Sequence, residues 1–458
     1  MEAKKESSRK EARKEDRHSY SVARPLKRKH VSAAASATKE EQEASPNNGP
    51  STKKAKPLHT ISSHQQEQQQ TDDGKNNVDW MQLPEELLAL VFSVLDPLFV
   101  GIAARTCRAW YSCAPPSLRD RLYKAAACSS ISLLAWAVEE NDCPFNAGLT
   151  AMMAKQGKLE VLKWAREELG CPWDTATCDL AAEHGHLELL QWARARGCPW
   201  SRYTCINAAQ NGHVEVLKWA RQNGCPWDDF VCRLAARQGQ LEALKWAREN
   251  GCPWDERVCS RAAEGGHLEV LKWARENGCP WNSQTCSMAA YYGHLDILQW
   301  ARENGCPWNH QTCNWAATSG HLEVLQWARK NGCPWGANTC AHAAEHGHLE
   351  VLKWLRANGC PWQEDTCTNA AQRGHLEVLK WARENGCPWD EQACTGAAEY
   401  GRLEVLKWLR ANGCPWDKDT CHSAALGNHW EVLRWARENG CPWGKSARKW
   451  AAENGYVE

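Results

Sequence analysis

The sequence predicts an all-α solenoid, a row of helical hairpins in which each hairpin buries its apolar face on the next. The composition is biased, with 28 Trp and 25 Cys but only 4 Phe, which indicates a copied segment. The tripeptide Cys-Pro-Trp recurs every 27 residues from Cys171 to Cys441. Each such unit reads as two short amphipathic helices between glycines, and one hairpin is too small to be stable alone.

The unit that begins at Cys252 illustrates the first helix. Its fourth residue, Asp255, is a preferred N-cap residue, so the helix should begin just after it. Cys259, Ala262 and Ala263 then fall at i, i+3 and i+4, which predicts a stripe of small buried side chains that lets helices pack closely. A glycine ends the segment.

The second helix of the same unit is predicted from about His267 to Asn277, between Gly266 and Gly278. Its apolar face is expected to be Leu268, Val270, Leu271, Trp273 and Ala274. The stripe expected to face solvent is Glu269, Lys272 and Arg275. Both recurrent sets of tryptophans, one in the turn and one in the second helix, are predicted to belong to the core.

The run Ala-Ala-x-x-Gly-His-Leu-Glu-Val in these units resembles the core of the ankyrin repeat. The resemblance covers residues 124–458, where it implies about twelve helix pairs and a final helix. The usual Thr-Pro-Leu-His start is replaced, as in Thr285-Cys286-Ser287-Met288, and the period falls short of the ankyrin period of ~33 residues. The missing residues should be those of the β-hairpin finger. Leucine-rich repeats are excluded, because their Leu-x-x-Leu-x-Leu strand is absent.

Ahead of the repeats, residues 83–110 read LPEELLALVFSVLDPLFVGIAARTCRAW. This stretch resembles an F-box, the helical motif that docks on the Skp-type linker subunit of cullin ubiquitin ligases. The resemblance places an F-box-like motif in residues 76–123. It departs from the family at 99–102, where the usual Asp-Leu is replaced. It implies partner contacts at Leu83, Pro84, Leu87, Leu88, Val91, Phe92, Leu95, Pro97, Cys107 and Trp110.

Residues 1–75 are polar, with a glutamine run and few aromatics, and are predicted to be a disordered tail. Two basic clusters in it are typical of nuclear import signals, at Lys27, Arg28, Lys29, Lys53, Lys54 and Lys56. The N-terminus has no apolar signal-peptide core, and no run approaches the ~18 apolar residues of a membrane span. We expect a protein of the cytoplasm or nucleus that is not secreted and has no membrane partner.

The repeated cysteines and histidines invite a metal or catalytic interpretation. Four zinc ligands must lie within ~2.3 Å of one ion, whereas equivalent residues on stacked helices lie ~8–10 Å apart, so we predict free buried thiols in place of zinc sites. Gln240 and Arg402 replace the recurrent histidine, which favours a hydrogen-bonding position at the helix start. We predict no cofactor, no metal and no enzymatic activity.

Six positions vary between units, the fifth, sixth, ninth, tenth, thirteenth and fourteenth. They are predicted to share one exposed face of the first helix, the face that ankyrin repeats use for partners. The predicted target contacts are Leu180, Glu183, His184, Asn207, Gln210, Arg237, Met288, Tyr291, Tyr292, Trp315, His342, Glu345, Asn369, Arg373 and Tyr400, and Thr318 belongs to the same set. The alternative is that solvent tolerates substitution there.

These observations lead to one main hypothesis, a substrate-recruiting F-box subunit of a cullin (SCF-type) ubiquitin ligase. Its partners would be a Skp-type linker with the cullin core, and a target protein on the concave repeat face. We expect a monomer apart from the complex, and no nucleic-acid partner, since Lys+Arg and Asp+Glu balance at 55 each. Two alternatives stay open: a ligase-independent scaffold in which residues 83–123 cap the first repeat, and a nuclear regulator that uses the basic tail.

Overall fold

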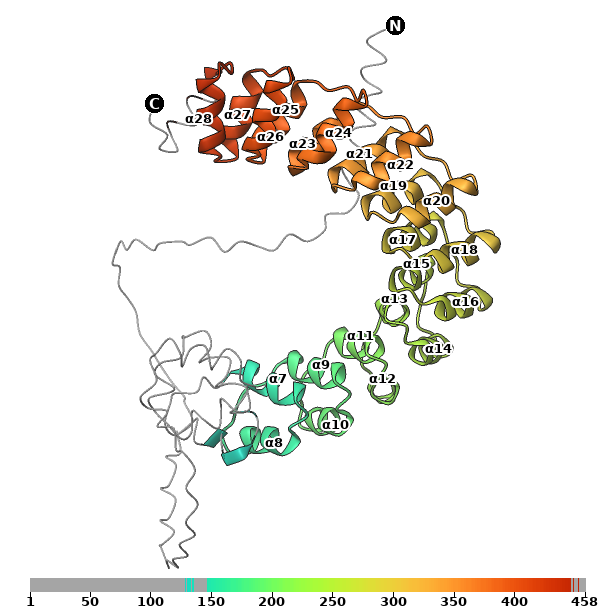
Figure 1. The fold of residues 1–458 in the computed structure, drawn as a ribbon. Helices are drawn as coiled ribbons and strands as arrows, with labels where there is room; N and C mark the ends of the chain where they lie inside the picture. The colour runs from blue at the N-terminus through green and yellow to red at the C-terminus, as the bar shows by residue number, and fades with distance from the viewer. Residues whose placement is uncertain are drawn as a thin grey trace, which may run out of the picture. The chain divides into compact units, whose positions relative to one another are not determined.

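The computed structural model describes residues 128, 130–132, 134–135, 146–445, 448 and 452. Every regular element in this part of the chain is a helix, which confirms the predicted all-α solenoid without β-hairpin fingers. The helices stack in pairs along one row, as Figure 1 shows. None of the described helices is long and apolar enough to cross a membrane. The predicted pairs and final helix that fall outside these residues stay predictions.

Between residues 147 and 438 the described helices have 8 to 10 residues each. The first helices of the pairs are α7 (Ala147–Lys155), α9 (Thr175–Glu183), α11 (Arg202–Gln210), α13 (Phe230–Arg237), α15 (Glu256–Gly265), α17 (Ser283–Tyr292), α19 (His310–Thr318), α21 (Ala337–Glu345), α23 (Glu364–Arg373), α25 (Glu391–Glu399) and α27 (Lys418–Leu426). The second helices are α8 (Leu159–Glu167), α10 (Leu187–Ala195), α12 (Val214–Gln222), α14 (Leu241–Glu249), α16 (Leu268–Glu276), α18 (Leu295–Glu303), α20 (Leu322–Lys330), α22 (Leu349–Ala357), α24 (Leu376–Glu384), α26 (Leu403–Ala411) and α28 (Trp430–Glu438).

Helix starts and ends follow the predicted caps. The Asp255 carboxylate accepts the backbone N–H of Arg257 at 3.1 Å, at the start of α15. At the end of α16, Gly278 is left-handed, with φ +79°. The backbone N–H of Cys279 then donates to the Ala274 carbonyl at 2.9 Å, which closes a Schellman motif. Each unit therefore ends its second helix with the residue that opens the next Cys-Pro-Trp turn.

Neighbouring units are joined by the first cysteine of each unit. The Cys279 thiol donates to the carbonyl of Asp255, the N-cap residue of the preceding unit, at 3.3 Å. The same contact recurs along the row at 3.3 to 3.9 Å. All described cysteines are buried, which confirms the prediction of buried thiols.

First helices of neighbouring units pack directly on one another, whereas second helices of neighbouring units touch little. The cause is side-chain size, because Cys259, Ala262 and Ala263 of α15 are fully buried and small. The second helices carry Leu and Trp and spread apart. Along the row from α7 to α20 the first helices consequently lie on its inner side (Figure 1). Below, the inner surface means the solvent-facing side chains of the first helices.

Two predictions about the second helix are wrong. The tryptophans are half-buried and flank the core, and Trp281 packs edge-on against Trp300 with 5.9 Å between ring centroids. Arg275 does not belong to a solvent-facing stripe. Its guanidinium lies over the Trp281 ring of the next unit, 4.1 Å from the centroid, and donates to the Cys279 carbonyl. This cation–π contact covers the turn tryptophan, which was also predicted to belong to the core.

The recurrent histidine also joins units. His375 precedes α24 and its Nε2 donates to the Glu345 carbonyl of the preceding unit at 3.1 Å. Arg402 replaces it in a later unit and donates Nε to the Gln372 carbonyl at 3.2 Å. The predicted hydrogen-bonding role is confirmed, and its partner is the end of the preceding first helix.

This packing gives two glycines of one unit different costs of substitution. Gly347 and Gly359 share a φ of +78°, but a Cβ on Gly347 would lie 2.7 Å from the His375 ring, whereas one on Gly359 would meet nothing within 4 Å. Gly359→Ala should cost about 1–2 kcal/mol, the penalty of a left-handed alanine. Gly347→Ala should cost about 1 kcal/mol more, because His375 must give up its hydrogen bond.

Urea titrations of the two variants and the parent chain, followed by circular dichroism, measure both costs. Equal losses of unfolding free energy would contradict the contact between units at Gly347.

Candidate interaction surface

The predicted target contacts from Leu180 to Tyr400 all lie on first helices or directly after them. Arg237, Tyr292 and Arg373 are exposed. The half-buried members are Leu180, Glu183, His184, Asn207, Gln210, Met288, Tyr291, Trp315, His342, Glu345, Asn369 and Tyr400. Thr318 is buried, and its hydroxyl donates to the Asn314 carbonyl at 2.9 Å, so the prediction that it faces solvent is wrong.

Three aromatic residues of α17 and α19 form one cluster on the inner surface. The Tyr291 ring lies edge-on to Tyr292, at 4.9 Å between centroids, and to Trp315, at 5.2 Å. Tyr292 is 42% exposed. Met288, on the same helix as the tyrosines, packs against the core. The aromatic cluster below means Tyr291, Tyr292 and Trp315.

A buried carboxylate lies beside the aromatic cluster. The Glu264 side chain at the end of α15 is 6% exposed and pairs with Arg237 at 3.0 Å and with Arg261. The Tyr292 hydroxyl donates to the same carboxylate at 3.2 Å. Burial, together with the Glu264 charge, raises the pKa of Tyr292. Side chains from three consecutive units therefore share one network, which fixes their relative positions.

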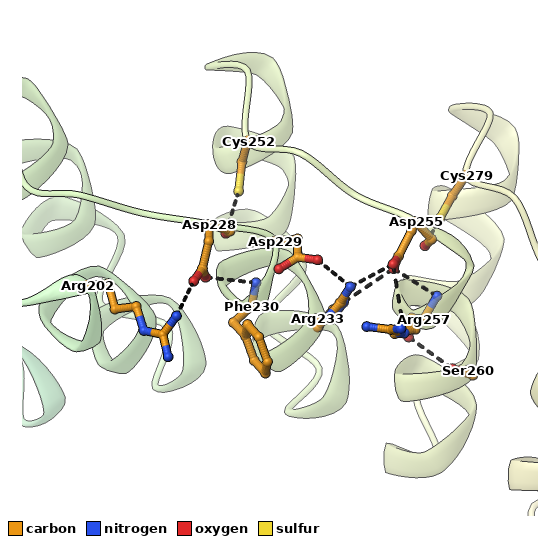
Figure 2. Close-up of polar contacts among 10 residues, drawn as sticks. All are labelled: Arg202, Asp228, Asp229, Phe230, Arg233, Cys252, Asp255, Arg257, Ser260 and Cys279. Carbon is orange, nitrogen blue, oxygen red and sulfur yellow. Dashed lines mark hydrogen bonds and ion pairs between the residues drawn. The ribbon is translucent and has the colours of Figure 1, made fainter.

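A second group, at the start of the first helices, was not among the predicted contacts; Figure 2 draws its members Arg202, Asp228 and Phe230. Tyr203 and Phe230 are 51% and 44% exposed, on neighbouring units. The Arg202 guanidinium lies 5.2 Å from the Tyr203 ring and 5.9 Å from the Phe230 ring, and it pairs with Asp228 at 3.0 Å. These aromatics occupy the sixth position of their units. That position varies between units, and this variation was the sequence signal that could have identified them as surface residues.

The ninth position does not belong to the exposed face. Figure 2 shows Arg233 lying between two carboxylates, Asp229 of its own unit and Asp255 of the next. The Arg233 side chain is only 7% exposed, and its Nη2 lies 2.6 Å from Asp255. Ser260, at the same position one unit later, is also buried. The prediction that the ninth position faces solvent is wrong, because the ninth residue points at the first helix of the next unit. The residue spacing within one helix does not reveal this neighbour.

A third group lies on α21, α23 and α25. Arg373 donates to the Glu345 carboxylate at 2.7 Å, and its guanidinium lies 6.0 Å from the Tyr400 ring. The contact with His342 and the Arg373 guanidinium lower the pKa of Glu345 to about 2. The predicted residues His342, Glu345, Arg373 and Tyr400 thus lie together, in a group separate from the aromatic cluster.

The buried thiols shift one another's pKa in pairs. A hydrogen bond with Cys279, together with burial, raises the pKa of Cys259. In the pair Cys286 and Cys306, the shared hydrogen bond raises the pKa of Cys286 and lowers that of Cys306. Thiols whose pKa is raised stay protonated at neutral pH. Within the described residues no group of three or more His, Cys, Asp or Glu side chains is placed to hold a metal ion.

The comparisons with known proteins identify two modules. Residues 80–125 match the F-box-like family model. Residues 259–300, 286–329 and 340–383 match the model for ankyrin repeats in many copies. The chain thus contains an F-box-like motif and ankyrin repeats, as the sequence predicted, and both families are protein-interaction modules. The predicted Skp-type contacts from Leu83 to Trp110, and the basic clusters, lie outside the described residues.

Solved structures give weaker likenesses. The ankyrin repeat domain of human ASB11 is 19% identical with a TM-score of 0.33, over 40% of this chain and 98% of that one. The pentatricopeptide repeat protein PPR10, in complex with an 18-nt psaJ RNA element, is 16% identical with a TM-score of 0.34, over 81% and 66%. No curated protein matches the sequence.

The histidines between units should make stability depend on pH. Burial lowers the pKa of His348 and His375 below 6.5. The unfolded chain then binds protons at these positions more readily than the folded chain. The free energy of unfolding should fall as the pH drops through ~6.5 toward the lower folded-state values, and should be constant in this respect above ~7.5.

Melting temperatures at about pH 7.5 and about pH 5.5 test this linkage. The test variant carries His348→Gln and His375→Gln, because glutamine occupies the same position natively at Gln240. Its melting temperature should drop less between the two pH values than that of the parent chain. An identical drop in both proteins would show that these two histidines do not carry the effect.

Proposed function

Because the chain joins an F-box-like motif to a row of ankyrin repeats, we propose that it is a substrate-recruiting subunit of a cullin-type ubiquitin ligase. The coarser statement, that it is a protein-interaction adaptor, follows from the two modules. One observation carries the finer proposal: a motif of the ligase-docking family and a repeat surface with exposed aromatics are present in the same chain.

The F-box-like motif supplies the ligase side of this proposal. Residues 83–95 place apolar side chains at helical spacing, with Pro84 at the N-terminus of the expected helix. A motif this small cannot bury all of these side chains by itself, so a partner is expected to cover them. The Skp-type linker is the partner that the family resemblance implies.

The inner surface supplies the target side. The positions that join units barely change between repeats, whereas the tenth, thirteenth and fourteenth positions change in almost every unit. At the fourteenth position of one unit the side chain is the large aromatic Tyr292. It stays 42% exposed instead of being covered by the next unit. Tyrosine, tryptophan and arginine supply most of the binding energy in protein interfaces, and these are the types present.

A pull-down of purified Skp-type linker with the full-length chain tests the proposal. Leu83→Ala with Pro84→Ala should weaken binding at least about tenfold, because it removes apolar contact and the preferred helix start. The control is Leu426→Ala, which truncates a leucine that is 51% exposed on α27, outside the F-box-like motif, and should bind as the parent does.

Failure of the parent chain to bind the linker would contradict the ligase role. The chain would then act as a ligase-independent scaffold, with residues 83–123 capping the first repeat. Weakening by the control variant as well would point to loss of folding instead of loss of a contact.

A further inference from the structure

The Lys–Glu ion pairs of the second helices and the Arg–carboxylate pairs of the first helices expose opposite partners to solvent. In the Lys–Glu pairs of the second helices, such as Lys272 with Glu269, the lysine side chain is 35% exposed and the glutamate 77%. The pairs of the first helices are the reverse, since Arg237 is 44% exposed and its partner Glu264 is 6%. The same order holds for Arg202, Arg257, Arg261 and Arg373, while the buried Arg233 is the exception.

Beside the aromatic cluster this asymmetry is strongest. Glu264 is shared by Arg237 and Arg261, so the network carries one excess positive charge, and both guanidinium groups face solvent while the carboxylate does not. Each guanidinium has five N–H donors in a planar fork that fits a carboxylate. The network can therefore accept a second carboxylate from outside the chain.

The aromatic cluster adds an apolar surface beside the carboxylate that both arginines bind. Tyr292 links the two features, because its hydroxyl bonds Glu264 while its ring contacts Tyr291. The edge-on contacts hold the three rings in one arrangement, so little side-chain freedom is lost when a partner binds. A carboxylate and a large apolar side chain would be bound next to each other.

We propose that Arg237, Arg261 and the aromatic cluster bind a peptide segment of the target protein in which a carboxylate side chain lies beside a large apolar side chain. This inference rests on the proposed recruitment of a target by the inner surface and names its chemistry. Charge complementarity selects the occupant, since a basic segment would meet exposed arginines and would be repelled.

The surface has a definite length. From α13 to α19 there are three steps between neighbouring first helices, each of roughly 8–10 Å, which is about 24–30 Å in all. An extended chain advances ~3.3 Å per residue, so about nine residues span the surface. A peptide of about 12 residues is therefore a sufficient probe.

The experiment uses the full-length chain and a phage-displayed library of random peptides of about 12 residues. Selected peptides should be enriched in Asp and Glu beside Leu, Ile, Phe or Trp. One enriched peptide, labelled and titrated in fluorescence anisotropy, then reports affinity. Labelled single-stranded RNA of about 12 nucleotides is titrated in parallel, since arginines beside aromatics also suit bases and phosphates.

Two variants replace the residues of the proposed binding surface. Each substitution installs a side chain that another unit carries at the same position. Arg237→Gln, Arg261→Asn and Glu264→Gln together remove the charges without leaving a buried carboxylate unpaired. Tyr291→Gln, Tyr292→Asn and Trp315→Asn together remove the aromatic cluster. Each should weaken peptide binding at least about tenfold with little change in melting temperature.

The matched control is Lys272→Gln, on the outer surface. It changes the net charge by one, as the charge variant does, and glutamine occupies this position natively at Gln299. Its peptide affinity should equal that of the parent chain. Circular dichroism and melting temperature verify that all three variants fold.

Three results would overturn the inference: no enrichment of acidic and apolar peptides, an affinity that neither triple variant changes, or RNA binding that both triple variants abolish. Its failure is separable from failure of the ligase proposal. The triple variants should still capture the Skp-type linker, and the Leu83→Ala, Pro84→Ala chain should still bind the selected peptide.

Discussion

The hydrogen bond from each turn cysteine to the carbonyl of the fourth residue of the preceding unit is the contact on which the row of repeats depends. In Figure 2, Cys252 reaches the Asp228 carbonyl and Cys279 reaches the Asp255 carbonyl. Each bond ties the start of one unit to the start of the first helix before it. The contact persists at Cys171, where donor and acceptor are 25 residues apart and the distance is 3.9 Å.

This constraint separates two classes of residue. Small side chains such as Cys259 and Ala263 are fully buried where first helices meet, and Arg275 closes the turn from the other side. The sixth, tenth and fourteenth positions of the first helix mostly face the inner surface and differ between units. The packing positions therefore stay constant while the surface positions vary, which suits a protein-interaction adaptor with one F-box-like motif and a variable repeat surface.

Sequence reasoning predicted most of the fold and part of the surface. It found the helix limits and the small stripe, because caps, glycines and 3.6-residue spacing act within one unit. It missed the half-burial of Trp281 under Arg275 and the burial of Arg233, because each depends on a neighbouring unit. It placed Tyr291, Tyr292 and Trp315 near one another, but not the buried Glu264 that fixes Tyr292 beside two arginines.

Hydrogen–deuterium exchange of the full-length chain, alone and with each partner, tests the separation of the two functions most directly. The account predicts that the Skp-type linker slows exchange within residues 80–125. A selected acidic and apolar peptide should slow it in α13, α15, α17 and α19, with the second helices α14, α16, α18 and α20 unchanged. Protection that is strongest in the second helices, or a linker that protects the repeats instead of residues 80–125, would contradict it.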